Sequence, residues 1–148
     1  MGKVEYWLFY LRNCSRIEQI KKTLRWLRYN IRMDLTNIND LKLALKISGH
    51  SAKKGLGQHF LVDKESLDKV IEAGELASTD TVIEIGPGLG VMTTKLTELA
   101  RKVYAVELDD KLAALLENDK PENLEVIKKD VMQLNLNDFP KGYKVVAN

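Results

Sequence analysis

The chain has 148 residues, of which 45% are hydrophobic and 30% are charged, so its composition is that of a globular protein, neither disordered nor membrane-spanning. One cysteine, Cys14, excludes an internal disulfide and a metal site built from several cysteines, and it fits a reducing cytoplasm. The net charge of +2 is unevenly spread, because residues 1–32 carry eight Lys or Arg against two Glu, whereas the remainder is mildly acidic.

Residues 1–32 are predicted to form a basic amphipathic amino-terminal extension. Their apolar residues recur at spacings of three or four among arginines and lysines: Ile17, Ile20, Leu24, Leu27 and Ile31. Such an arm could contact nucleic acid or an anionic membrane surface, or it could be a solvated helix. A start site upstream of the true one at Met33 is a further alternative, and it is the one we prefer.

Residues 33–62 are predicted to hold one helix and a loop. Thr36 or Asn37 can cap the helix, which carries apolar residues such as Leu41 and ends at Gly49. A basic loop follows at residues 51–57, and its two lysines could meet phosphates.

Residues 63–148 alternate short apolar runs with helical stretches. Asp63 is a good N-cap for a first helix. Strands are then predicted at residues 81–85, 102–106, 124–127 and 143–147, with helices at residues 92–99 and 110–117. This alternation predicts an α/β fold with a parallel sheet, right-handed crossovers and helices on both faces.

The strongest chemical signal is the run Thr81–Gly90, TVIEIGPGLG, in which a buried strand enters a glycine-rich turn. Glycine lets the backbone adopt positive φ and lets a ligand lie against the main chain without a Cβ in the way. In open α/β sheets ligands bind here, at the carboxyl ends of the strands. Gly86 and Gly88 are therefore candidate binding residues; a turn that needs glycine for geometry alone is the alternative.

Acidic residues follow the next two predicted strands. Glu107 lies 21 residues after Gly86 and could accept hydrogen bonds from both ribose hydroxyls of a nucleotide-like ligand. Asp130 could accept one from an adenine amino group. A dinucleotide fingerprint would carry its third glycine where this chain has Val91. The pattern therefore favours S-adenosylmethionine over a nicotinamide cofactor, and we expect no metal.

Two further segments carry a family resemblance. Residues 53–63, KKGLGQHFLVD, resemble the amino-terminal motif of the KsgA/RsmA rRNA adenine N6-dimethyltransferase family. Residues 145–148, VVAN, resemble the strand that leads into that family's Asn-x-Pro-aromatic catalytic motif. The resemblance runs from about Met33 to Asn148. It implies a Rossmann-like class I S-adenosylmethionine-dependent methyltransferase fold, here incomplete with about four strands, in which residues 63–148 form a partial cofactor-binding domain.

The resemblance also implies roles for matching positions. His59 and Leu61 would contact the methionine portion of the cofactor. Gly86 would pass its backbone close to the cofactor, Glu107 would hold the ribose hydroxyls, and Asp130 would meet the adenine amino group.

Asn148 would be the first residue of the catalytic motif and would lie between the methyl donor and the target base. Its side-chain oxygen would accept a hydrogen bond from the adenine N6 amine and aim that amine in line with the methyl group, so that positioning dominates catalysis. The proline and aromatic residue expected next are absent from the sequence. We therefore expect a truncated chain that is inactive or binds the cofactor weakly.

The implied activity is that of a cytoplasmic enzyme of ribosome biogenesis. It would transfer methyl groups to N6 of two adjacent adenines near the 3′ end of small-subunit (16S) rRNA, with S-adenosylhomocysteine as product, and Lys53 and Lys54 could contact the RNA. An Erm-type enzyme acting on 23S rRNA, or a non-catalytic RNA-binding or assembly module of the same fold, are the alternatives.

We expect no membrane association and no obligate protein partner. If the strand at residues 143–147 pairs with the first strand, it leaves an unprotected sheet edge. Such edges recruit other chains, so self-association of the chain is expected.

Overall fold

The computed structural model describes residues 34–47, 63–118 and 120–147. These fall in two units, Met1–Ser51 and Ala52–Asn148, and each is described by itself. The first unit contains the helix α3 (Ile38–Ile47). Its start is fixed by Asn37, whose side-chain oxygen accepts a hydrogen bond from the amide of Asn39 at 2.9 Å and whose carbonyl accepts one from the amide of Leu41. Asn37 is thus one of the two predicted caps.

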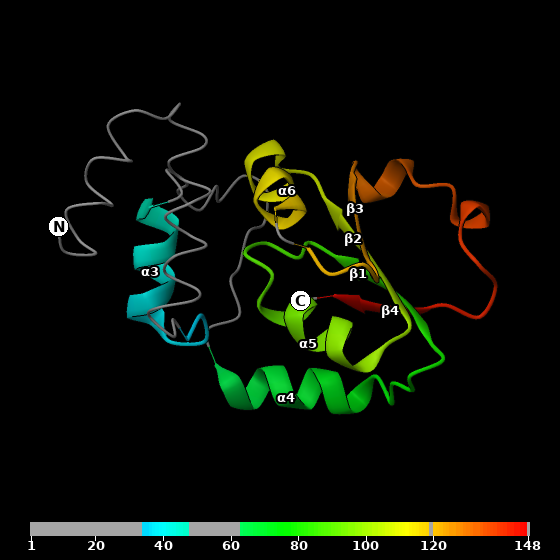
Figure 1. The fold of residues 1–148 in the computed structure, drawn as a ribbon, viewed down its shortest axis with the longest axis horizontal. Helices are drawn as coiled ribbons and strands as arrows, with labels where there is room; N and C mark the ends of the chain where they lie inside the picture. Colours follow the sequence, from blue (N-terminus) through cyan, green and yellow to red (C-terminus); the bar gives the residue numbers. More distant parts are fainter. Residues whose placement is uncertain (1–33, 48–62, 119, 148) are drawn as a thin grey trace, which may run out of the picture. The chain divides into compact units, whose positions relative to one another are not determined.

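The second unit is built on a parallel four-stranded sheet with the order β3-β2-β1-β4, and Figure 1 shows the strands stacked in this order. The strands are β1 (Thr81–Ile85), β2 (Lys102–Glu107), β3 (Leu124–Lys128) and β4 (Lys144–Ala147). All four predicted strands are present, and their ends differ from the prediction by at most one residue. The predicted parallel α/β sheet is confirmed.

One helix precedes the first strand of this unit, and two helices and two short 3-10 turns connect its strands. They are α4 (Lys64–Ala73), α5 (Val91–Leu99), α6 (Asp110–Glu117), η2 (Val131–Gln133) and η3 (Leu136–Asp138). Asp63 caps α4 as predicted, because its carboxylate accepts a hydrogen bond from the amide of Ser66 at 2.8 Å. Asp109 caps α6 in the same way, accepting from the amides of Lys111 and Leu112.

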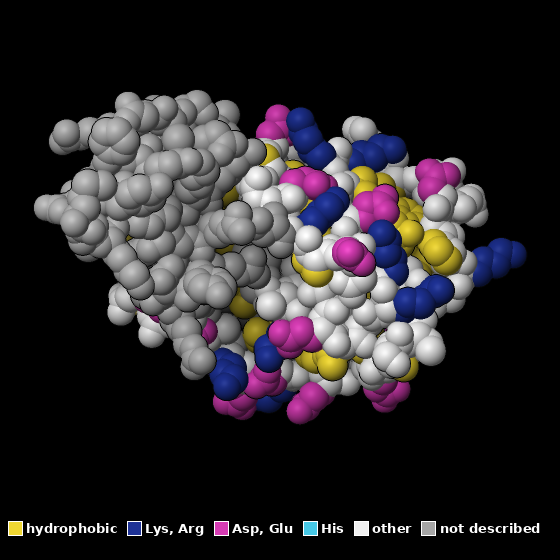
Figure 2. All heavy atoms as spheres, in the orientation of Figure 1, with side chains coloured by type: hydrophobic (Ala, Val, Ile, Leu, Met, Phe, Trp, Pro, Cys, Tyr) yellow, Lys and Arg dark blue, Asp and Glu magenta, His cyan; other side chains and the backbone are white. Residues whose placement is uncertain are grey.

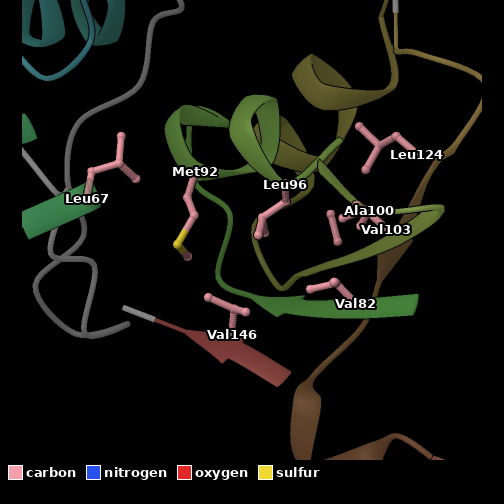
Figure 3. Close-up of a cluster of buried hydrophobic side chains, with 9 residues drawn as sticks. Leu67, Val82, Met92, Leu96, Ala100, Val103, Leu124 and Val146 are labelled. Atoms are coloured by element: carbon pink, nitrogen blue, oxygen red, sulfur yellow. The ribbon is translucent and has the colours of Figure 1, made fainter. Parts of the chain in front are cut away.

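The main core lies between one face of the sheet and the helices α4 and α5. Figure 3 shows Leu96 of α5 above the strand residues Val82 and Val103, with Leu67 of α4 and Val146 of β4 beside them. Leu96, Val82 and Val103 are fully buried, which is expected for the apolar stripe of a helix packed on a central parallel strand. This core fixes where α5 begins relative to the end of β1.

The sequence predicted helices on both faces of the sheet. The structure covers the opposite face in a different way. Among the described residues, its core consists of Ile83 and Val106 packed against Phe139, which belongs to the irregular segment between β3 and β4. Phe139 meets Tyr104 edge-on, with ring centroids 5.0 Å apart. The chain between β3 and β4 must pass over this face of the sheet. The aromatic side chain of Phe139 fills the space there.

β4 pairs with β1, as the sequence reasoning expected. The Nζ atom of Lys144 holds the start of β4 in place, because it lies 3.0 Å from the Asp80 carboxylate and donates a hydrogen bond to the carbonyl of Gly74 at 3.1 Å. In the part of the chain that the structure describes, β4 is the last strand on its side of the sheet. Self-association through this edge stays a prediction.

The described surface carries mixed charge. Figure 2 shows acidic and basic side chains interspersed over one face, without a large area of either sign. Within residues 34–47, 63–118 and 120–147, no helix has the length and apolar character needed to cross a bilayer.

Candidate functional site

The sheet register brings the ends of its strands together at one edge. Ile85, the last residue of β1, pairs with Val106 of β2 and with Ala147 of β4. Glu107, the last residue of β2, pairs with Lys128 at the end of β3. The glycine turn after β1 and the residues that follow β2 and β3 therefore share the carboxyl edge of the sheet, where ligands of open α/β folds bind.

The three glycines of the turn all adopt a left-handed backbone, with φ of +68° at Gly86, +60° at Gly88 and +79° at Gly90. At Gly90 a Cβ would lie 2.7 Å from Cδ2 of Leu116, so glycine serves packing there. At Gly86 no heavy atom of the described residues lies within 4 Å of the Cβ position, so within this part of the chain the space beside the backbone is open. An open space beside a left-handed turn is what close approach of a ligand to the main chain requires.

The turn passes directly into helix α5. The amide of Gly86 extends the β1–β2 pairing by donating to the carbonyl of Val106 at 3.0 Å, and the amide of Gly90 closes the turn on the carbonyl of Pro87 at 2.9 Å. Gly90 is the N-cap of α5, and as a glycine it has no side chain that could accept a hydrogen bond from the first turn of the helix. The amide groups of the first helical turn therefore keep their partial positive charge available to a polar ligand.

Glu107 is the acid most closely joined to the turn. Its Oε2 accepts a hydrogen bond from the amide of Gly88 at 3.1 Å, and its Oε1 accepts one from the amide of Asp109 at 2.8 Å. The side chain is only 5% exposed. An ionised carboxylate has about four acceptor positions, so positions remain for a ligand. Glu107 thus couples the glycine turn to the start of α6 and presents acceptors at the same edge.

Asp130 follows β3 at the same edge. It caps the turn η2, with its Oδ1 accepting a hydrogen bond from the amide of Met132 at 2.9 Å. The neighbouring amide of Lys129 donates to the carbonyl of Glu107 at 3.1 Å, so the backbones after β2 and β3 are held together. The structure therefore brings Gly86, Gly88, Glu107 and Asp130 to one edge of the sheet.

Glu84 is a further polar residue at this site, and the sequence reasoning did not select it. It lies in β1 two residues before Gly86 and is fully buried, and neither of its carboxyl oxygens has a hydrogen-bond partner among the described residues. Burial raises the pKa of Glu84 to about 7; the nearby Thr93 hydroxyl lowers this pKa and the Glu107 carboxylate raises it. The Thr93 hydroxyl makes no hydrogen bond of ordinary geometry with it. The feature of the sequence that could have identified Glu84 was a charged residue inside the otherwise uncharged run TVIEI.

Five of the predicted site residues lie outside the described part of the chain. They are Lys53, Lys54, His59, Leu61 and Asn148. Their proposed roles therefore remain predictions from the family resemblance. The strand that leads to Asn148 is described, and it ends level with the glycine turn because Ala147 pairs with Ile85.

The described site suits a ligand with a ribose and an adenine. Acceptors for hydroxyl and amino groups are present at Glu107 and Asp130, and open space lies beside Gly86. S-adenosylmethionine has these groups, so the residues fit this cofactor. Within the described ranges, no three His, Cys, Asp or Glu side chains gather in a way that could hold a metal ion.

Comparison with known proteins finds a matching family and relatives that are named for methylation of ribosomal RNA. The family described as ribosomal RNA adenine dimethylase matches residues 49–148. The chain is 43% identical over 100 residues to the protein named Ribosomal RNA small subunit methyltransferase A of Clostridium botulinum (strain Okra / Type B1), and 48% identical over 102 residues to the protein of that name from Dehalococcoides mccartyi (strain ATCC BAA-2266 / KCTC 15142 / 195).

These alignments cover 64% and 66% of the chain but only 36% and 35% of the relatives, so the chain matches about a third of their length. Among solved structures, a dimethyladenosine transferase from Plasmodium falciparum is similar with a TM-score of 0.51 and 34% identity. That similarity covers 58% of this chain and 32% of the other.

Replacing Gly86 by alanine tests whether the open space beside the turn receives a ligand. Gly142 is the matched control, because it has φ of +83° and no heavy atom within 4 Å of its Cβ position. Both substitutions place alanine in a left-handed conformation and are expected to cost about 1 kcal/mol of stability. Only Gly86→Ala should weaken S-adenosylhomocysteine binding, roughly tenfold or more by calorimetry. Equal affinities of the two variants would contradict the assignment.

The buried carboxyl of Glu84 predicts an unusual pH dependence of stability. Its pKa rises from the ordinary 4.5 to about 7 on folding, so between these values the folded state binds more protons than the unfolded state. Stability should therefore fall as pH rises from about 4.5 to 7, by an amount on the order of 3 kcal/mol. Urea denaturation at several pH values measures the free energy of unfolding, and in Glu84→Gln this free energy should not show the decrease between about pH 4.5 and 7. The same pH slope in both proteins would refute the prediction.

Proposed function

We propose that this chain, which belongs to the ribosomal RNA adenine dimethylase family, binds S-adenosylmethionine at the glycine turn and forms the cofactor-binding part of a small-subunit rRNA adenine N6-dimethyltransferase. The whole enzyme would transfer methyl groups to two adjacent adenines near the 3′ end of 16S rRNA in the cytoplasm. The cofactor supplies an activated methyl group on a sulfonium ion, and the protein supplies binding and orientation.

The observation that carries this proposal is the hydrogen bond from the amide of Gly88 to Oε2 of Glu107, at 3.1 Å. It joins the turn that would receive the cofactor to the carboxylate that would hold the ribose hydroxyls. The second bond of Glu107, from the amide of Asp109, fixes the orientation of the carboxylate. Both bonds come from backbone amides, so the acid is already positioned without the ligand, and little ordering remains to oppose binding.

Asp130 would receive the adenine amino group at the end of β3. Its side chain is held by the amide of Met132, and its neighbour Lys129 is tied to the backbone of Glu107. The two acids would therefore recognise the ribose and adenine of one nucleoside from adjacent strands. His59 and Leu61, in the family-like motif, would contact the methionine portion of the cofactor.

The target base would meet the cofactor at the end of β4. Asn148 follows this strand directly and would accept a hydrogen bond from the N6 amine, which orients the amine toward the methyl group. No general base is needed, since N6 can lose its proton after the methyl group is transferred. Lys53 and Lys54 would contact RNA phosphates.

The choice of small-subunit over large-subunit rRNA is supported by the names of the curated relatives, which are small subunit methyltransferases at 42% to 48% identity.

The division into an extension at residues 1–32, a helix and motif loop at residues 33–62 and a partial methyltransferase domain from residue 63 remains a prediction. The absence of a metal and the absence of an obligate protein partner are also still predictions.

Substitution of Glu107 tests the cofactor assignment. Glu107→Gln keeps the size of the side chain but removes the charge and replaces one acceptor oxygen by an amino group, so S-adenosylhomocysteine should bind on the order of tenfold to a hundredfold more weakly. Glu98→Gln on the exposed side of α5, whose side chain is 63% exposed, is the matched control and should bind like the native chain. Calorimetry measures both. Native affinity in Glu107→Gln would remove the ribose role.

The RNA substrate is tested with the complete product of the gene that encodes this chain. Unmethylated small-subunit and large-subunit rRNA are each supplied with S-adenosylmethionine, and N6,N6-dimethyladenosine is measured by mass spectrometry of the digested RNA. Dimethylation of two adjacent adenines near the 3′ end of the small-subunit rRNA is expected. Methylation of large-subunit rRNA alone would favour the Erm-type activity, and no methylation of either would favour a non-catalytic module.

A further inference from the structure

Glu84 lies where no described residue compensates a charged side chain by an ion pair or a hydrogen bond. In the sheet register its neighbours are Ala105 on β2 and Val146 on β4, both buried and apolar. Across from it, on α5, the Thr93 hydroxyl is buried and has no hydrogen-bond partner in the part of the chain that the structure describes. An ionised carboxylate in such a place loses its hydration and gains no hydrogen bond in return, so the protonated form is favoured.

The charged groups on the elements packed against β1 do not neutralise Glu84. Glu107 on β2 is a second carboxyl group, which accepts hydrogen bonds from two backbone amides, and its charge opposes ionisation of Glu84. Lys102 on β2 pairs with Glu125 at 3.0 Å, and Lys144 on β4 pairs with Asp80 at 3.0 Å. Both lysines lie at the amino ends of their strands, away from the turn.

The remaining charges nearby are also engaged or exposed. Lys95 and Glu98 of α5 face each other at 4.0 Å, with half or more of each side chain exposed. Asp109, which follows β2, caps α6. Among the described residues, then, Glu84 and Glu107 form a pair of carboxyl groups beside the glycine turn that has no cation of its own.

A ligand that brings positive charge to this turn would supply the missing cation. On the function proposed above, two ligands alternate there that differ by one methyl group and by one unit of charge. S-adenosylmethionine carries a sulfonium cation, whereas the sulfur of S-adenosylhomocysteine is neutral. A nearby positive charge favours the ionised form of a carboxyl group, and loss of that charge favours the protonated form.

We propose that Glu84 carries a proton in the ligand-free protein, releases it to the solvent when S-adenosylmethionine binds at the glycine turn, and keeps it when S-adenosylhomocysteine binds. Glu84 is then a residue that distinguishes the methyl donor from the product by charge. The inference rests on the proposed cofactor but adds a role for a residue outside the predicted set.

The proposal fixes the direction of the pH dependence of binding. Binding that releases a proton becomes stronger as pH rises, until the free protein has already lost that proton. With a pKa of Glu84 of about 7, affinity for S-adenosylmethionine relative to S-adenosylhomocysteine should rise about tenfold between roughly pH 5.5 and 7. The protein would therefore discriminate most strongly against product at neutral and higher pH.

Titration calorimetry of the chain in two buffers of different ionisation enthalpy counts the protons released on binding. At about pH 6, where roughly nine-tenths of Glu84 is protonated, native protein should release close to one proton per S-adenosylmethionine and almost none per S-adenosylhomocysteine. In Glu84→Gln the two counts should become equal. A difference that persists in Glu84→Gln belongs to another titrating group and overturns the proposal.

A second variant retains the carboxyl group, in case Glu84→Gln does not fold. Thr93→Val removes the hydroxyl that lowers the pKa of Glu84, so the proton should be kept to higher pH. At pH 7 this variant should release more protons per S-adenosylmethionine than native protein. An unchanged count would contradict the role of Glu84. Absence of binding heat with both ligands in the native chain would instead contradict the cofactor assignment itself.

Discussion

The central strand β1 pairs in parallel with β2 on one side and with β4 on the other, and its first four residues are buried. This pairing sets the position of everything at the carboxyl edge. The glycine turn leaves β1 level with Glu107 of β2 and with the end of β4, because the register matches Ile85 to Val106 and Ala147. A slip of one residue in either pairing would turn the alternating side chains to the wrong face and separate these groups.

The burial of β1 that orders the turn also makes ionisation of the carboxyl group within this strand unfavourable. Val82 and Ile83 occupy the two apolar cores on opposite faces of the sheet, whereas Glu84 puts a carboxyl group beside apolar neighbours, the Thr93 hydroxyl and a second carboxyl group, that of Glu107. A carboxyl group in such surroundings is expensive to ionise. Titratable groups of this kind are concentrated at functional sites, and the position of Glu84 two residues before Gly86 agrees with that tendency.

Glu107 shows how one side chain can serve both structure and binding. Its carboxylate holds the amide of Gly88 in the turn and the amide of Asp109 before α6, and Asp109 in turn caps α6. The turn, the second strand and the following helix are thereby joined through one charged group. A ligand that reaches Glu107 would meet an acid whose orientation is already fixed, which is the arrangement expected of a preorganised binding site.

The sequence by itself determined the four strands to within a residue, the cap Asp63, and the meeting of Gly86, Glu107 and Asp130 at one edge, whereas it left Thr36 and Asn37 as alternative caps of α3. These follow from local rules, since hydrophobic periodicity, capping residues and parallel connectivity are all readable along the chain. Only the tertiary structure decided that Phe139 covers the second face of the sheet, that Glu107 accepts a hydrogen bond from Gly88, and that Glu84 has no hydrogen-bond partner among the described residues. Each of these depends on which distant side chains meet, and burial and hydrogen bonding across the sheet are properties of packing that no local pattern encodes.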